Sequence, residues 1–119
     1  MNYVLVAIGA AIGGVLRYAI GVLTPSQSGF PWTTFGINIV GSFLLGIIIG
    51  LSSEKFLSEE VRLLLAVGFC GGFTTFSTFS AESLSLLQTK EYLLAFGYIL
   101  SSTTLGIMLT YLGFKIGKT

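Results

Sequence analysis

Long apolar stretches separated by short polar connections dominate the pattern of this chain. Four of these stretches predict helices, at about residues 2–23, 32–51, 61–88 and 92–114. Each stretch has about 20 residues or more, which is the length that crosses a hydrocarbon core of about 30 Å. The connections are the polar stretch Thr24–Gly29, the charged stretch Ser52–Glu60 and the pair Lys90–Glu91. The pattern predicts one all-α membrane domain with four spans over residues 1–119.

The third predicted span contains an unusual segment, Gly71–Ser80, which reads GGFTTFSTFS and has neither a charge nor an aliphatic residue. Adjacent glycines weaken a helix, so we expect the helix to break at the glycine pair, near the middle of the span. A broken backbone at membrane depth is tolerated only where it is buried in protein or lines a cavity. Freed carbonyl oxygens, such as those of Gly71 and Thr74, suit a hard cation such as Na⁺.

Two phenylalanines of this segment, Phe76 and Phe79, lie three residues apart and would share one face of a helix. The edge of a phenyl ring carries partial positive charge, so it can solvate a small anion that the ring face would repel. Ordinary core filling is the alternative for aromatic residues at this spacing. The interleaved hydroxyl residues, including Ser77 and Thr78, favour the wall of an anion path.

Three polar side chains interrupt the other apolar stretches or follow the unusual segment. Arg17 would either extend to the interface or supply a fixed positive charge at an aqueous vestibule, where it would concentrate anions. Asn38 must find partners at membrane depth, either in another helix or in a passing anion. Glu82 has no histidine to relay a proton, so we favour a hydrogen-bonded structural role or a place at a pore mouth.

The fourth predicted span carries Tyr98, Ser102, Gly106 and Thr110 at intervals of four residues, which places them along one helical face. Such a face could form a continuous polar path for an ion. The alternative is that several of these hydroxyls bond to carbonyls of their own helix.

Composition supports the membrane assignment and excludes several classes of function. The chain is 53% hydrophobic and 9% charged, whereas soluble domains are about 25% charged. Its net charge of +1 gives no electrostatic basis for binding nucleic acid. One cysteine and no histidine argue against a transition-metal site and against a hydrolytic centre. We therefore expect a protein that is not an enzyme.

Glycine spacing suggests how the helices pack. Three pairs have the four-residue separation that lets helix backbones approach closely in lipid: Gly9 and Gly13, Gly46 and Gly50, Gly68 and Gly72. Four helices of this size can hardly enclose a pathway, so we expect close contacts both within one chain and between chains.

The chain resembles the Fluc (CrcB) fluoride channels of prokaryotes over essentially its whole length. The resemblance rests on the segment Gly13–Tyr18, which reads GGVLRY, on Asn38 in the second span, and on Gly71–Ser80 in the third. It implies passive, selective export of fluoride across the cell membrane, which lowers the toxicity of fluoride in the cytoplasm. It also implies a homodimer of dual topology, in which two copies insert antiparallel.

The same resemblance implies roles for individual residues. Carbonyls of Gly71 and Thr74 from both chains would hold a structural Na⁺ at the dimer centre. Two fluoride pores would run through the dimer, and Arg17 would lie near a vestibule. The pore residues implied are Asn38, Phe76, Ser77, Thr78, Phe79, Tyr98, Ser102 and Thr110.

Two alternatives concern the partner and the activity. Lys and Arg are unevenly shared between the two sides of the predicted topology, which would also suit pairing with a homologous chain of fixed orientation. A small four-span, proton-coupled exporter of the multidrug type would need a carboxylate in the first span, and that span offers only Arg17. A membrane scaffold without transport activity would not need the unusual third span.

Overall fold

The computed structural model describes residues 1–25 and 29–119, and within these residues it is an all-α protein with four helical stretches long and apolar enough to cross a membrane. Residues 26–28 of the predicted polar connection lie outside the described residues. Three of the stretches are single helices: α1 (Asn2–Leu23), α2 (Trp32–Ser53) and α6 (Tyr92–Lys118). The bounds of α1 agree with the prediction, while α2 and α6 extend a few residues further than predicted.

The third stretch is composite, as the sequence led us to expect. It begins with the short helix α3 (Glu59–Arg62) and continues as a π-helix, η1 (Leu63–Cys70). The helix α4 (Gly71–Phe73) follows, and after an interruption the stretch ends with α5 (Phe76–Gln88). A π-helix within an α-helical span is rare and is often found near functional sites.

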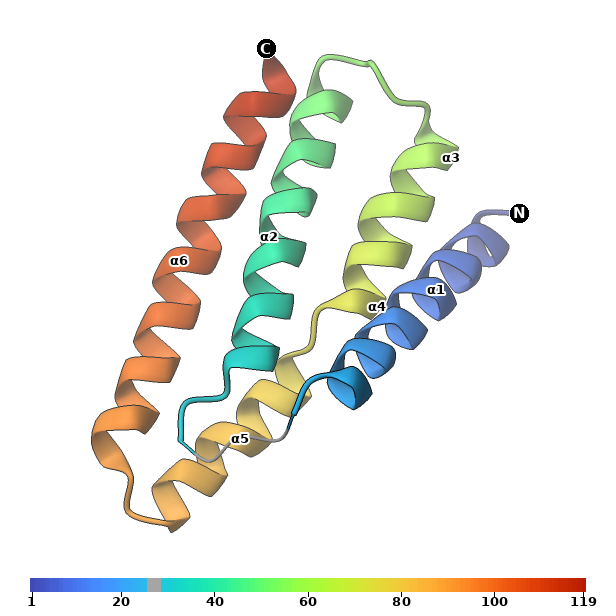
Figure 1. Cartoon of the computed structure of the whole chain (residues 1–119). Coiled ribbons are helices and arrows are strands. Elements are labelled where there is room, and N and C mark those ends of the chain that lie inside the picture. The colour runs from blue at the N-terminus through green and yellow to red at the C-terminus, as the bar shows by residue number, and fades with distance from the viewer. Residues whose placement is uncertain (26–28) are drawn as a thin grey trace.

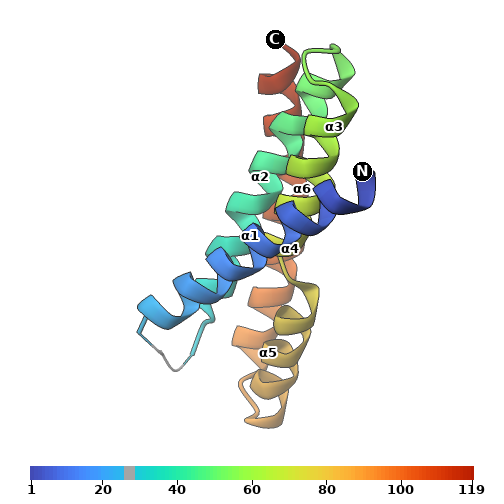
Figure 2. The same cartoon turned by 90° about the vertical axis from the view of Figure 1, so that its right-hand side faces the viewer.

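The helices form two closely packed pairs (Figure 1). α6 lies along α2, and α1 crosses η1 and α4. The two chain termini and the α2–α3 connection lie toward the same end of the molecule (Figure 1). Beyond the crossing, α1 and α5 diverge, as the rotated view shows (Figure 2).

Both helix pairs depend on glycine. A Cβ at Gly46 of α2 would overlap the carbonyl oxygen of Thr110, and a Cβ at Gly113 of α6 would overlap that of Phe43. In the other pair, added Cβ atoms at Gly9 and Gly72 would overlap the carbonyl oxygens of Leu64 and Ala10 respectively. Added Cβ atoms at Gly13, Gly50 and Gly68 would likewise come within 3.0 Å of backbone atoms of the facing helix. The three glycine pairs predicted from the sequence therefore serve close contacts within the chain.

A small aromatic core joins the start of α2 to α5 and α6. Ala95 and Tyr98 are completely buried, and Leu86 packs with them. Phe30, Phe35 and Phe79 surround this group, with the Phe30 and Tyr98 ring centroids 5.4 Å apart in an edge-on arrangement. This core positions the side chains described below. Most other large apolar side chains lie exposed on the outside of the helices, as lipid contact requires.

Candidate functional site

The backbone of the third span breaks at Thr74 and Thr75. Both residues are extended, with φ and ψ of −83° and 159° for Thr74 and −147° and 123° for Thr75. The prediction that the break lies at the glycine pair is wrong, because Gly71 is helical at −62° and −38°. Gly72 packs against Ala10 of α1, so this glycine serves a close helix crossing, and the helix continues through both glycines.

Asn38 holds the broken backbone from the neighbouring helix. Its Nδ2 donates to the carbonyl oxygen of Thr75 at 3.0 Å, and its Oδ1 accepts from the Thr75 N–H at 2.8 Å. In a continuous helix that N–H would donate to the carbonyl of Gly71. The expected bond to another helix is thus confirmed. A primary amide has two N–H donors, so one N–H of Asn38 remains for another acceptor.

The start of α5 frees a second carbonyl. The Thr75 hydroxyl oxygen accepts from the Thr78 N–H at 3.1 Å, which makes Thr75 the N-terminal cap of the helix. A continuous helix would have paired that N–H with the carbonyl of Thr74. Gly71 and Thr74, the two residues whose carbonyls were predicted to be freed, therefore both lose their helical donors. The Ser77 hydroxyl lies 3.3 Å from that of Thr75 and is exposed.

Arg17 reaches the break from α1. Its Nε donates to the carbonyl oxygen of Gly72 at 3.2 Å, and its side chain is half-buried. The bond satisfies another carbonyl at the end of α4, where the helical donors are interrupted. A positive charge is thus placed beside the broken backbone, in contact with it.

Phe76 and Phe79 lie next to each other on the first turn of α5, as predicted. Their ring centroids are 5.7 Å apart and their planes are inclined by 42°. Phe79 is half-buried and packs on Tyr98, with the centroids 5.0 Å apart. Phe76 is 77% exposed. Core filling within the chain thus accounts for Phe79 and leaves Phe76 free to contact something else.

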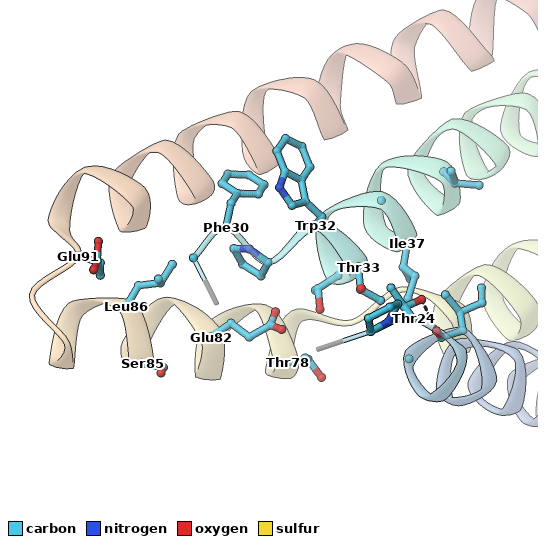
Figure 3. A pocket seen from close by; sticks show the side chains of 18 of the residues that line it. Thr24, Phe30, Trp32, Thr33, Ile37, Thr78, Glu82, Ser85, Leu86 and Glu91 are labelled. Atoms are coloured by element: carbon cyan, nitrogen blue, oxygen red, sulfur yellow. Dashed lines mark hydrogen bonds between the residues drawn. The ribbon is translucent and has the colours of Figure 1, made fainter. Parts of the chain in front are cut away.

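Tyr98 and Glu82 form the polar link between α6 and α5. The Tyr98 hydroxyl donates to Oε1 of Glu82 at 3.0 Å, while the Tyr98 ring is completely buried. Glu82 also lines a pocket of about 1030 Å³ where α1 and α5 diverge. Figure 3 shows Glu82 and Thr78 of α5 around this pocket, together with Thr33 from the start of α2. The hydrogen-bonded role expected for Glu82 is confirmed.

The other residues of the predicted face of α6, Ser102, Gly106 and Thr110, line a groove of about 570 Å³ between α2 and α6. There the Thr110 hydroxyl donates to the carbonyl of Gly106 at 2.8 Å and lies 3.2 Å from that of Ser42. The Ser102 Oγ is buried and has no hydrogen-bond partner among the described residues. Thr110 thus follows the alternative considered for these hydroxyls, in which they bond to carbonyls of their own helix. The predicted face divides, since Tyr98 joins α5 and the other three residues line the groove.

Sequence reasoning missed two components of this site. Thr75 was recognised only as one of several hydroxyl residues, although a threonine before a run of helical residues is a common helix-start signal. Gly113 and Gly117, which complete the packing of α2 on α6, repeat the same four-residue spacing as the pairs that were recognised. Both signals were present in the sequence.

Together, these features define a class: a four-span membrane protein whose third helix is interrupted and is held by an amide side chain of one neighbouring helix and a guanidinium group of another. The site offers carbonyl oxygens, amide and hydroxyl hydrogens and phenyl edges. These groups can replace the hydration of a small ion without binding it too tightly to leave.

Residues 4–114 match the family described as CrcB-like protein, Camphor Resistance (CrcB), and the chain belongs to this family. A relative in Thermus thermophilus, named a fluoride-specific ion channel FluC, is 50% identical over 118 residues. That alignment covers 98% of this chain and 94% of the relative. Proteins of the same name from Oceanobacillus iheyensis and Phocaeicola vulgatus are 46% and 45% identical, over 97% and 94% of this chain and 90% and 94% of theirs. The resemblance found in the sequence is confirmed.

Proposed function

We propose that this protein is a fluoride-selective channel that lets fluoride leave the cytoplasm passively through a prokaryotic cell membrane, and so lowers its toxicity. The observation that carries the proposal is the break at Thr74 and Thr75. It places freed backbone groups beside the exposed ring of Phe76 at membrane depth. The names of the relatives, each a fluoride-specific ion channel, support fluoride as the ion.

The chemistry of the site suits a small, strongly hydrated anion. The free N–H of Asn38, the hydroxyls of Ser77 and Thr78, and the ring edges of Phe76 and Phe79 would replace water around fluoride. None of these groups carries a full charge, so the ion can also leave. The polar path would continue to Tyr98, Ser102 and Thr110, and the charge of Arg17 would favour anions near a vestibule.

The pore would be completed by a second copy of the chain, inserted antiparallel. Phe76 is 77% exposed, and none of the described residues lies within 4 Å of a Cβ placed on Gly71. The open side of the break is therefore available to a partner. A homologous chain of opposite orientation is the less favoured partner, and cross-linking of the purified protein to itself distinguishes the two.

A structural Na⁺ at the dimer centre fits the donors that the break supplies. The carbonyls of Gly71 and Thr74 have lost their helical donors, and neutral oxygen atoms are the ligands that hard cations prefer. These carbonyls, contributed by both copies, would hold the ion. The ion would add positive potential near two anion paths.

Liposomes that contain the purified protein and a fluoride gradient test the proposal. We expect fluoride to leave down its gradient while chloride is retained, with no requirement for a proton gradient. Chloride efflux at the same rate would refute fluoride selectivity. Fluoride movement only in exchange for protons would instead favour a proton-coupled exporter of the multidrug type. Such an exporter would need a carboxylate in the first span, and α1 has none.

The two phenylalanines give the sharpest test of the pore wall. Phe76→Ile and Phe79→Ile remove ring edges while keeping apolar bulk. Pairs of aromatic rings are worth about 0.5–1.5 kcal/mol beyond their burial, and we assign the contact of a phenyl edge with fluoride an energy of the same order. We expect fluoride efflux to slow by roughly two- to tenfold for each variant. Phe96→Ile is the matched control, because Phe96 is 56% exposed on α6 and lies outside the site. Efflux that is equal in all three variants would show that the rings only pack.

A further inference from the structure

A notch in α2 faces the broken backbone one turn after Asn38. The notch is Gly41, which is buried and lies three residues further along the helix, on the same face. A Cβ at this position would overlap Cγ2 of Thr74 and would lie 3.3 Å from Cδ2 of Phe73. This contact differs from the other close glycine contacts, because the opposing atom is a methyl group of one side chain and not the backbone of a packed helix.

The Thr74 side chain has little freedom to move out of the notch. Its hydroxyl donates to the carbonyl oxygen of Cys70 at 2.8 Å, and its N–H donates to the same oxygen at 3.0 Å. Threonine is branched at Cβ, so its methyl group turns only together with its hydroxyl. A rotation that removes the methyl from the notch would therefore break the bond to Cys70.

We propose that Gly41 is a positioning residue that sets the direction of the broken backbone at Thr74. Asn38 holds Thr75 through both of its backbone groups, and Gly41 admits the side chain of Thr74, so α2 fixes two consecutive extended residues from two consecutive turns. Any side chain at position 41 displaces Thr74 and, with it, the carbonyl that the break has freed. The inference rests on the proposed function, because the path for fluoride runs beside this carbonyl.

The chain offers a direct experiment, because the methyl group that causes the overlap can be removed. Gly41→Ala creates the overlap, and Gly41→Ala combined with Thr74→Ser removes the opposing methyl while keeping the hydroxyl that bonds Cys70. Thr74→Ser alone supplies the baseline for the double variant. Gly36→Ala is the matched control on the same helix, since no residue that the structure describes lies within 4 Å of its added Cβ. Fluoride efflux from liposomes and the thermal midpoint in detergent are measured for each protein.

We expect Gly41→Ala to slow fluoride efflux by roughly tenfold or more, because an added atom in a packed contact forces side chains and backbone to move. The double variant should regain the efflux of Thr74→Ser, its thermal midpoint should rise in parallel, and Gly36→Ala should match the original protein. Normal efflux in Gly41→Ala would overturn the proposal, and so would a defect that Thr74→Ser does not relieve. An original protein that moves no fluoride would refute the proposed function, while the thermal midpoints would still test the contact.

Discussion

Asn38 can be tested as the residue that keeps the third helix open. The substitution Asn38→Leu keeps the number and branching of the side-chain heavy atoms and removes both hydrogen bonds to Thr75, at 3.0 Å and 2.8 Å. The freed Thr75 N–H then has one acceptor within reach of ordinary helix geometry, the carbonyl of Gly71. We expect the break to close part of the time, because closing it is the only local way to satisfy that N–H.

The size of the effect follows from the two bonds. Leaving a buried backbone group unsatisfied costs about 1–3 kcal/mol in soluble proteins, and hydrogen bonds between membrane helices average about 0.6 kcal/mol each. Thr75 is half-buried, so we expect Asn38→Leu to lower the free energy of unfolding by about 1–3 kcal/mol. If the same energy favours the closed helix, fluoride efflux falls by roughly tenfold.

Two measurements separate the loss of stability from the loss of transport. Equilibrium unfolding in mixed micelles gives the free energy of unfolding, and fluoride efflux from liposomes gives the transport rate. Ser53→Ala is the matched control, because Ser53 lies on the same helix and donates one hydrogen bond, at 2.7 Å to Gly50 within that helix. The control should change neither quantity by more than a small amount.

The reasoning would be refuted by Asn38→Leu protein with normal efflux and a normal free energy of unfolding. It would also fail if efflux fell while amide exchange showed the Thr75 N–H of the variant to be unprotected, since a closed helix would bond that N–H to the carbonyl of Gly71. In that case Asn38 would act only by direct contact with the ion.

Two further predictions concern the packing around the site. Gly46→Ala should destabilise the protein by about 1–3 kcal/mol, because its Cβ would overlap the carbonyl oxygen of Thr110. Equilibrium unfolding measures this change. Gly97→Ala is the control that should leave stability unchanged, because its added Cβ meets no atom within 4 Å among residues 1–25 and 29–119. Tyr98→Phe should cost about 1–3 kcal/mol, because the bond to Glu82 at 3.0 Å is lost and a carboxylate loses its donor; an unchanged free energy of unfolding would contradict this.

The spans could be predicted from the sequence because apolar length is the dominant signal in a membrane protein. The first and third predicted spans end at Leu23 and Gln88, as the helices do. The break was predicted in the correct segment and misplaced by a few residues. Helix propensity disfavours Gly71 and Gly72 by about 1 kcal/mol each. At Gly72 the crossing with α1 outweighs that preference, since only glycine admits the backbone of Ala10 there. Gly71 is helical without such a contact among the described residues.

The site was harder to predict because its geometry depends on residues distant in the sequence. Asn38 was identified as a polar side chain in need of partners, but nothing near it indicates that both backbone groups of Thr75 would be those partners. In the same way, the intervals of four residues along α6 correctly united Ser102 with Thr110 in one groove. They could not show that Tyr98 would turn to Glu82 and join the core with α5.

The two helix pairs that pack through glycine are interleaved along the chain, since the first span packs on the third and the second on the fourth. This order has a consequence for synthesis at the ribosome. When the second span enters the membrane, neither its partner nor the partner of the first span has yet inserted. α1 must therefore wait for η1, and Gly46 and Gly50 on α2 stay uncovered until α6 inserts. Biogenesis thus depends on whatever shields these glycine surfaces in the interval, and a nascent chain that stops before the fourth span exposes α2 to quality control.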